Sequence, residues 1–305
     1  MKKIIASVAI GLAAIIAATG WQSAGAAEKK ELTFAVIQDI RMSVSAKMWE
    51  EPLNYVSKRA GAKFSFYATT SYASVVEAML GGFVDIAKLG PKIYIVAAEK
   101  SKGTIVPVAS FAREANIFNP VPCACYYGAL ITKKGGSFPT IESLKGKAVL
   151  ALVDPGSTSG NALPRALFPK EIGGATLDDY FARIFYSGSH DASNLAVLKG
   201  KADAAFVAES TMIRMIDKGE LKKEDFNYLW RSPQIPIDTL AVNTKTLSKE
   251  MIRKITKAFT DMHKDPEGRK MLKILGRAQF TPASDATFDS LRKILAAKAK
   301  LKKKK

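Results

Sequence analysis

The chain has 305 residues, of which 48% are hydrophobic, and carries a formal net charge of +18 at pH 7. This length is sufficient for two α/β lobes rather than one small domain. With only two cysteines and two histidines, the chain has no ligand set for a structural zinc site, and we expect neither a metal nor a cofactor. The basic excess favours an acidic ligand, because a positive surface raises the encounter rate with anions.

Residues 1–26 have the pattern of a secretory signal peptide. Lys2 and Lys3 form a basic start, residues 4–19 are mostly small and apolar, and Ala-Gly-Ala at 24–26 is a small-x-small cleavage signal. An uncleaved membrane anchor is the alternative, but the apolar run is short for a bilayer span. We therefore expect an exported protein that is soluble after cleavage, located in the periplasm if the source has two membranes.

Strand and helix patterns alternate after the leader. Residues 32–37 are predicted to form a first strand, 45–59 a helix and 64–68 a second strand, which is the beginning of a parallel α/β sheet. Residues 78–87 are echoed at 196–205. Both segments predict the end of a helix, a glycine stop, an aspartate and a buried strand. Two lobes of similar build would explain the echo, and chance similarity between two common units is the alternative.

The two cysteines, Cys123 and Cys125, lie two positions apart in a strand-like stretch and would point to the same face. In an extended strand their Cα atoms would be about 6.6–7 Å apart, at or beyond the range of a disulfide. We therefore expect two packed thiols rather than a bridge.

Two strand-like runs, 126–132 and 237–242, are predicted to be the crossings between the lobes. The first lobe then comprises residues 28–124 and 240–290, and the second lobe residues 125–239. A discontinuous first lobe with a two-strand hinge can close around a ligand. Two continuous domains are the alternative.

The end of the chain is rich in lysine, with six lysines in the last eight residues. We interpret residues 291–305 as a Lys-rich tail, a disordered and solubilising end. Contact of this tail with anionic lipid or nucleic acid is the alternative.

The most informative motif is Asp-Pro-Gly-Ser-Thr-Ser-Gly at 154–160, directly before a helix-compatible run at 161–168. It would place three hydroxyls and several backbone N–H groups at a helix N-terminus, which favours an oxyanion. An ordinary N-cap is the alternative, since Ser and Thr are preferred there in any helix. Gly-Ser-His-Asp follows at 188–191, and the two motifs together indicate an anion cradle without catalytic machinery.

The order of the motifs resembles the PhnD-type periplasmic binding proteins, which are the phosphonate, phosphite and phosphate-ester binding components of ATP-driven importers. The segments that carry the resemblance are Ser-Tyr-Ala, Tyr-Tyr-Gly-Ala-Leu-Ile, Pro-Gly-Ser-Thr-Ser-Gly, Gly-Ser-His-Asp, Leu-Lys-Gly-Lys-Ala-Asp-Ala-Ala, Ala-Glu-Ser and Ser-Pro-Gln-Ile-Pro-Ile-Asp. The resemblance implies an α/β type II periplasmic-binding-protein fold, with two Rossmann-like lobes joined by a two-strand hinge. It further implies a monomer that is not an enzyme, binds no nucleic acid, and serves the permease and ATPase of an ABC importer.

The resemblance also implies how the oxyanion is bound. Hydroxyl and imidazole groups would contact it, namely those of Ser157, Thr158, Ser159, His190, Tyr72 and Tyr126. Either tyrosine could instead be a packing residue at the interface between the lobes, and His190 could instead be a surface histidine or a loop histidine with satisfied hydrogen bonds.

Two acidic residues, Glu209 and Asp238, would be the counter-charges for an ammonium group on the ligand. A site for a bare oxyanion gains nothing from two carboxylates, whereas a zwitterion needs opposite charges at its two ends. We therefore favour 2-aminoethylphosphonate, with phosphite or phosphate as the alternative ligand and structural roles as the alternative for both carboxylates. The spacing from His190 to Glu209 is about one residue tighter than in the phosphonate binders that the chain resembles.

Two other functions compete with ligand capture. A phospho-ester hydrolase could use one of the serines with His190 as its base, but the neighbouring Asp191 gives no triad geometry and no Gly-x-Ser-x-Gly elbow occurs. A nucleic-acid binder would need a basic face interleaved with aromatic residues, and the basic residues here are scattered or confined to the tail. The sequence therefore favours capture of a phosphonate by closure of a hinge.

Overall fold

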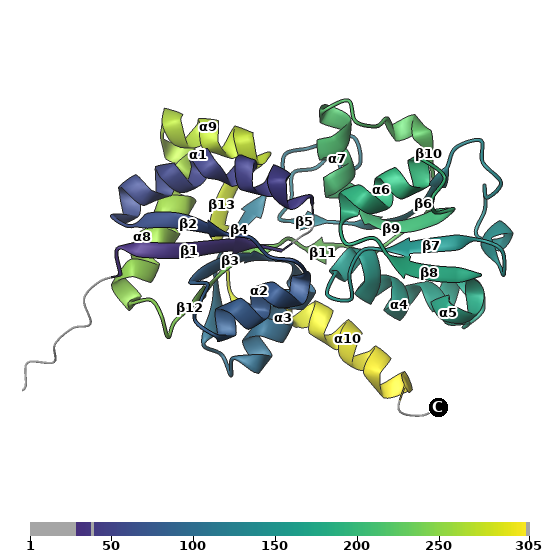
Figure 1. Ribbon diagram of the computed structural model, residues 1–305, viewed down its shortest axis with the longest axis horizontal. Coiled ribbons are helices and arrows are strands. Elements are labelled where there is room, and N and C mark those ends of the chain that lie inside the picture. The colour runs from purple at the N-terminus through teal and green to yellow at the C-terminus, as the bar shows by residue number, and fades with distance from the viewer. Residues whose placement is uncertain (1–28, 38–39, 303–305) are drawn as a thin grey trace, which may run out of the picture.

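The computed structural model describes residues 29–37 and 40–302, so the predicted leader lies outside the described residues. Two β-sheets lie side by side, each covered by helices, and a short two-stranded sheet lies between them (Figure 1). We call the first sheet with its helices lobe 1 and the second sheet with its helices lobe 2. Within the described ranges, no helix is long and apolar enough to cross a membrane.

The sheet of lobe 1 has six strands in the order β13-β4-β12-β3-β1-β2. Its strands are β1 (Glu31–Val36), β2 (Lys63–Tyr67), β3 (Ile86–Leu89), β4 (Ile105–Ala112), β12 (Thr239–Asn243) and β13 (Gln279–Pro282). Its helices are α1 (Met42–Ala60), α2 (Tyr72–Leu80), α3 (Pro91–Lys100), α8 (Lys249–Thr260) and α9 (Pro266–Leu275). The predicted strand, helix and strand at the start of the chain are confirmed as β1, α1 and β2.

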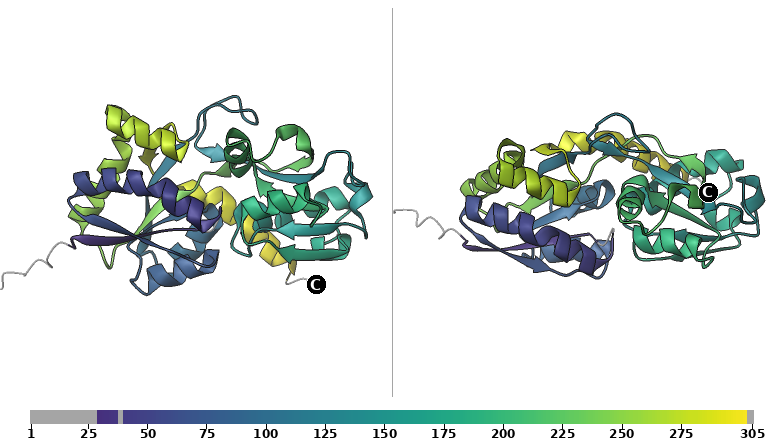
Figure 2. Two further views of the ribbon diagram at one scale, coloured as in Figure 1. Left: turned by 45° about the horizontal axis from the view of Figure 1, so that its top comes forward. Right: turned by 90° about the horizontal axis from the view of Figure 1, so that it is seen from above.

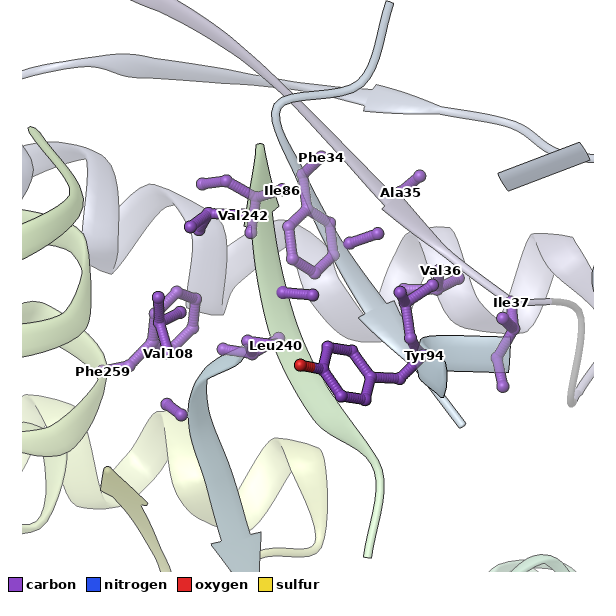
Figure 3. Close-up of a cluster of buried hydrophobic side chains, with 14 of the residues drawn as sticks. Phe34, Ala35, Val36, Ile37, Ile86, Tyr94, Val108, Leu240, Val242 and Phe259 are labelled. Atoms are coloured by element: carbon purple, nitrogen blue, oxygen red, sulfur yellow. The ribbon is translucent and has the colours of Figure 1, made fainter. Parts of the chain in front are cut away.

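The core of lobe 1 is built on its central strands. Phe34 on β1, Ile86 on β3 and Leu240 on β12 are all fully buried, and Figure 3 shows them beside Phe259 of α8. Burial of each such side chain stabilises the fold by about 1.5–3 kcal/mol. The core therefore fixes the carboxyl ends of β1 and β3, from which the chain leads to the interface between the lobes.

The sheet of lobe 2 has five strands in the order β10-β6-β9-β7-β8. Its strands are β6 (Gly128–Lys133), β7 (Val149–Leu152), β8 (Arg183–Tyr186), β9 (Ala204–Ala208) and β10 (Phe226–Arg231). Its main helices are the π-helical turn η2 (Thr158–Ala162), α4 (Leu163–Leu167), α5 (Leu177–Tyr180), α6 (His190–Leu198) and α7 (Glu209–Asp217). Phe206 and Val207 of β9 belong to different buried clusters, so both faces of this central strand are covered; it pairs parallel with β7 and antiparallel with β6.

The sequence echo corresponds to equivalent structure in the two lobes. In lobe 1, Asp85 precedes β3; its N–H donates to the Thr33 carbonyl at 3.0 Å, and its carboxylate accepts from the Thr33 N–H at 2.9 Å. In lobe 2, Asp203 precedes β9 and makes the same two bonds with Val149, at 2.9 and 2.8 Å. Each aspartate thus ties the start of the third parallel strand to the first, and the two lobes are of similar build.

The lobes are connected through a two-stranded ribbon in which β5 (Cys125–Tyr126) pairs antiparallel with β11 (Ile235–Pro236). The predicted crossings at 126–132 and 237–242 lie next to this ribbon but run mainly into β6 and β12. The lobe boundaries at 124/125 and 239/240 stay a prediction, because β5 and β11 pair with each other and belong to neither large sheet.

The prediction of two packed thiols is wrong. Cys123 and Cys125 form a disulfide, with their Cα atoms 5.1 Å apart. The longer predicted separation assumed a continuous extended strand, whereas the chain bends at Ala124, between an isolated bridge from Cys123 to Arg113 and the start of β5. The disulfide therefore closes a tight loop directly before Tyr126.

Replacing both cysteines by serine should lower the free energy of unfolding by about 1–2 kcal/mol, since a bridge across so short a loop restricts the unfolded chain only modestly. Thermal unfolding of the Cys123→Ser/Cys125→Ser variant and of the wild type, both without reductant, would measure this. Identical midpoints, with no free thiol detected in the wild type, would contradict the expected contribution.

The prediction of a disordered tail at 291–305 is also wrong for most of that segment, because α10 runs over Asp289–Lys302. Leu291 is buried in the core of lobe 1, and Ile294 and Leu295 pack against it. This i, i+3, i+4 apolar pattern favours a helix, and the high lysine content obscured it. Helix α10 contacts α3 of lobe 1 and α4 of lobe 2, and it is the yellow helix that crosses between the lobes in Figure 2.

Candidate functional site

A small pocket lies between the lobes, next to the β5–β11 ribbon. The residues that line it are Ile37, Tyr72, Gly90, Tyr126, Ser157, Thr158, His190, Ala208, Ser210, Thr211 and Asp238. Its volume of about 20 Å³ is room for about one water molecule. A ligand therefore enters only if the lobes move apart.

The pocket lies at the start of helices from both lobes. Tyr72 is the first residue of α2 and His190 the first of α6, whereas Gly90, Ser157 and Ala208 are the N-caps of α3, η2 and α7. The first turn of a helix has N–H groups without intrahelical acceptors and carries a partial positive charge. Because several such ends converge, the pocket favours an anion.

Ser157 and His190 form the inner wall of the pocket, and both are at least 95% buried. The Ser157 hydroxyl accepts from the Gly160 N–H at 3.1 Å and lies 3.4 Å from His190 Nε2. His190 Nδ1 accepts from the Ala208 N–H at 2.9 Å. Since Nδ1 is an acceptor, the proton of the neutral ring is on Nε2, which makes His190 a hydrogen-bond donor on the side facing Ser157.

Thr158 connects the cradle to the other lobe. Its Oγ1 accepts from the backbone N–H of Lys92 at 3.0 Å, and the Lys92 ammonium donates to the Pro155 carbonyl. Burial lowers the pKa of Lys92, and Asp154 opposes this shift. Lys92 belongs to α3, so these bonds form only when lobe 1 is closed over the loop at 154–158.

The two glycines of the motif are required by space rather than by backbone conformation. A Cβ at Gly156 would lie 2.7 Å from Tyr72 Cβ and 2.9 Å from Ile93 Cδ1, both in lobe 1. A Cβ at Gly160 would lie 2.4 Å from Val153 Cγ2, within lobe 2. Gly156 thus permits contact between the lobes, and Gly160 permits the loop to pack on its own sheet.

Of the predicted oxyanion contacts, Ser159 alone does not line the pocket. It is 1% exposed, and its Cβ would be 3.0 Å from a Cβ on Gly128 of β6. Its hydroxyl has no hydrogen-bond partner within the described protein. The structure therefore brings together Ser157, Thr158, His190, Tyr72 and Tyr126, and turns the third hydroxyl of the motif toward β6.

Glu209 does not line the pocket either. Its carboxylate accepts two hydrogen bonds from Arg231, at 2.7 and 2.8 Å, and the Arg231 guanidinium stacks 3.7 Å from the centre of the Tyr127 ring. Burial raises the pKa of Glu209, and Arg231 opposes this shift. The next residues of α7, Ser210 and Thr211, line the pocket instead, which fits the spacing that was one residue tighter than in the phosphonate binders.

Asp238 lines the pocket but is not alone there. Its carboxylate lies 2.9 Å from the ammonium of Lys88 on β3, and the side chains of Lys88 and Asp238 are 4% and 15% exposed. The acidic end of the pocket is thus already compensated by a buried cation. Sequence reasoning missed Lys88, because nothing in a strand pattern marks a lysine that pairs across 150 residues.

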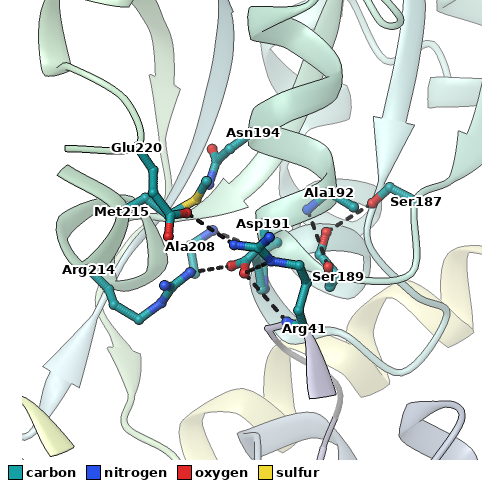
Figure 4. A network of polar contacts seen from close by, with 11 residues as sticks. Arg41, Ser187, Ser189, Asp191, Ala192, Asn194, Ala208, Arg214, Met215 and Glu220 are labelled. Carbon is teal, nitrogen blue, oxygen red and sulfur yellow. Dashed lines mark hydrogen bonds and ion pairs between the residues drawn. The ribbon is translucent and has the colours of Figure 1, made fainter. Parts of the chain in front are cut away.

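A second polar network joins the lobes beside His190 (Figure 4). Asp191, which is fully buried, accepts from the Arg41 backbone N–H and Nε at 3.4 Å and from Arg214 Nη2 at 2.6 Å. Arg41 Nη2 also lies 3.2 Å from Glu220. Arg41 precedes α1 of lobe 1 and the other three residues belong to lobe 2, so this network stabilises the closed arrangement.

The described ranges contain no group of three or more His, Cys, Asp or Glu side chains that could hold a metal ion. The polar groups of the pocket are instead hydroxyls, an imidazole, helix N-termini and the Asp238 carboxylate, and all except the carboxylate can donate hydrogen bonds to an anion. The fold and this pocket define a two-lobed ligand-binding protein of the type II periplasmic class.

Solved structures share the fold. The binding protein component of an ABC phosphonate transporter from Pseudomonas aeruginosa superposes with a TM-score of 0.80 at 22% identity, covering 89% of this chain and 87% of that one. A PhnD protein of Prochlorococcus marinus in complex with methylphosphonate superposes with a TM-score of 0.73 at 17% identity, covering 87% and 97%.

Sequence comparison identifies the family. The model of the ABC transporter phosphonate periplasmic substrate-binding proteins matches residues 34–288. The phosphate-import protein PhnD of Mycolicibacterium smegmatis is 30% identical over 233 residues, which are 75% of this chain and 70% of that protein. The phosphonates-binding periplasmic protein of Escherichia coli is 26% identical over 271 residues, 88% and 76% of the two chains. The chain therefore belongs to the family of phosphonate-binding periplasmic proteins of ABC transporters, a family of substrate-binding components rather than enzymes.

Proposed function

We propose that this protein captures a small phosphonate between its lobes in the periplasm and delivers it, as a monomer, to the permease and ATPase of an ABC importer. The observation that carries the proposal is the convergence of helix N-termini from both lobes on one pocket. The phosphonyl oxygens would accept hydrogen bonds from these N–H groups, from the hydroxyls of Ser157 and Thr158, and from His190 Nε2–H. Hydrogen bonds to charged oxygens are the strong ones, and closure strengthens them further by removing water.

The β5–β11 ribbon would be the hinge. Two short strands that belong to neither large sheet can absorb a rotation of the lobes without disturbing either core. The contacts of Lys92 with Pro155 and Thr158 and of Arg41 with Asp191 would then break on opening and form again on closure.

The first candidate ligand is 2-aminoethylphosphonate. Its ammonium would pair with Asp238, the carboxylate that lines the pocket, while its phosphonyl group lies at the helix N-termini. Glu209 takes no part in this proposal, because Arg231 neutralises it outside the pocket.

Phosphite or phosphate is the second candidate, and the Lys88–Asp238 pair favours it. An aminated ligand has to displace the Lys88 ammonium from Asp238, whereas a bare oxyanion leaves the pair intact. The relative preference for the two kinds of ligand therefore depends on how easily this pair opens.

The geometry argues against a Ser/His hydrolase. To act as the general base for the Ser157 hydroxyl, His190 would need an unprotonated Nε2. A carboxylate would also have to accept a hydrogen bond from its Nδ1–H. Nδ1 instead accepts from a backbone N–H, and Asp191 contacts Arg41 and Arg214. His190 is thus arranged to donate a hydrogen bond, not to remove a proton.

Calorimetric titration of the protein with 2-aminoethylphosphonate, methylphosphonate, phosphite and phosphate tests the proposal. In the Ser157→Ala variant all four should bind about tenfold more weakly, because each loses a hydrogen bond to a charged oxygen. Thr140→Val, which removes an exposed hydroxyl of lobe 2, is the matched control and should leave the affinities for all four ligands unchanged. No binding of any of the four by the wild type would overturn the transport function.

A further inference from the structure

A much larger cavity, of about 760 Å³, lies beside the small pocket. Its walls come from α1 and the end of β1 in lobe 1, from α7 in lobe 2, and from the turn between α9 and β13. Seven of its lining residues are cationic: Lys47, Lys88, Arg113, Arg214, Lys218, Lys273 and Arg277. Of the lining residues that the structure describes, two, Glu51 and Asp217, are acidic, and both are exposed. The described part of the wall is therefore strongly basic, and none of its less exposed residues carries a carboxylate.

Buried donors in this wall lack acceptors. Arg214 uses Nη2 to bind Asp191 at 2.6 Å, but its Nε and Nη1 have no hydrogen-bond partner within the described protein. The same holds for the indole N–H of Trp49, a residue that is 1% exposed. Buried donors without acceptors are unfavourable and rare, but the protein covers these atoms, so a ligand in the cavity would accept from them only after a local rearrangement of the wall.

The two cavities share part of their walls. Ser210 and Thr211 line both of them. Lys88 lines the larger cavity, and its partner Asp238 lines the smaller one. A ligand substituent that extends from the phosphonyl group, passing Ser210 and the Lys88–Asp238 pair, would therefore enter the basic cavity.

We propose that the preferred ligand carries a second anionic group, a carboxylate or a further phosphoryl group, which binds in this basic cavity while the phosphonyl group occupies the cradle. The inference rests on the proposed function, which supplies the binding site for the phosphonyl group, and adds the chemical class of the group at the other end of the ligand. Neither methylphosphonate nor 2-aminoethylphosphonate has a second anionic group that uses these cations. A phosphonate with both an amine and a carboxylate would pair with Asp238 and with the cationic wall at once.

Matched ligands isolate the contribution of the second anion. In calorimetric titrations, 3-phosphonopropionate should bind at least tenfold more tightly than ethylphosphonate, and 2-amino-3-phosphonopropionate at least tenfold more tightly than 2-aminoethylphosphonate. Each pair differs by one carboxylate. 4-Phosphonobutyrate, one methylene longer than 3-phosphonopropionate, measures how far the second anion lies from the first.

Variants locate the effect in the cavity. Arg113→Gln and Lys273→Gln should each reduce the advantage of the carboxylated ligand at least threefold and leave the affinity for methylphosphonate unchanged. Lys270→Gln is the matched control for Lys273, because both lysines are exposed on α9 and only Lys273 lines the cavity. It should leave every affinity unchanged, and thermal unfolding of each variant would verify that it is folded.

The outcomes separate the two proposals. Failure of every phosphonate to bind would overturn the proposed function itself. Tight binding of methylphosphonate with no gain from either carboxylate would overturn this inference alone. Binding of 3-phosphonopropionate to protein already saturated with methylphosphonate would also overturn it, because the two anions would then occupy independent sites.

Discussion

Replacing Gly156 by alanine should hold the two lobes apart and weaken binding of methylphosphonate by about tenfold to a hundredfold. The new Cβ would lie 2.7 Å from Tyr72 Cβ and 2.9 Å from Ile93 Cδ1, and overpacking of this kind costs about 1–3 kcal/mol. Both of these neighbours belong to lobe 1, so the two closest clashes arise only on closure and each lobe keeps its own core; Asp154 Oδ1, in the same loop, would lie 3.1 Å away and has to shift only slightly. Calorimetric titration measures the loss of affinity, and small-angle scattering with and without ligand measures closure.

Gly160→Ala is the informative comparison for Gly156→Ala. Its Cβ would lie 2.4 Å from Val153 Cγ2, inside lobe 2, so this substitution should lower the thermal midpoint of unfolding in the absence of ligand. Gly156→Ala should leave that midpoint nearly unchanged. Normal affinity and normal ligand-induced compaction in Gly156→Ala would show that the lobes do not close against residue 156.

Local periodicity made the fold predictable. The strand and helix patterns of the first 40 residues of lobe 1 correspond to β1, α1 and β2. The echo between 78–87 and 196–205 was informative because an aspartate at the start of a parallel strand binds the same backbone groups in both lobes. Such features depend on near neighbours in the chain or on a repeated unit, and these are visible in a single sequence.

The errors arose where one residue changes the direction of the chain or of a side chain. The bend at Ala124 brings Cys123 and Cys125 within bonding distance, and a strand pattern cannot show a bend at one residue. Successive side chains of a helix differ in direction by about 100°. The one-residue difference in spacing was therefore sufficient to place Ser210 in the pocket and Glu209 against Arg231.

Contacts between residues far apart in the chain could not be predicted at all. Arg41 and Asp191 are 150 positions apart, and Lys88 on β3 meets Asp238, which directly precedes β12, only after folding. Neither pair has a sequence signature. Both nevertheless bear directly on function, because the first connects the lobes next to His190 and the second sets the charge at one end of the pocket.

Replacing Asp238 by asparagine should change the order of ligand preference. The affinity for 2-aminoethylphosphonate should fall about tenfold, because its ammonium loses its carboxylate partner. The affinity for methylphosphonate should rise severalfold. Lys88, 4% exposed and paired with Asp238 at 2.9 Å in the wild type, would lose this carboxylate, and a buried ammonium is less stable when the negative charge beside it is reduced. A bound anion would then supply the missing negative charge, so part of the electrostatic cost of the buried ammonium is relieved on binding.

Two further variants test whether the change in preference comes from recognition of the ammonium group by Asp238. Lys88→Met releases Asp238 from its partner and should have the opposite effect, strengthening 2-aminoethylphosphonate relative to methylphosphonate. Glu209→Gln should leave the ratio of the two affinities unchanged, because the Glu209–Arg231 pair lies outside the pocket. Calorimetric titration of all three variants with both ligands measures the ratios. Equal changes for the two ligands in Asp238→Asn, or a selective loss of the aminated ligand in Glu209→Gln, would show that the ammonium is not recognised by Asp238.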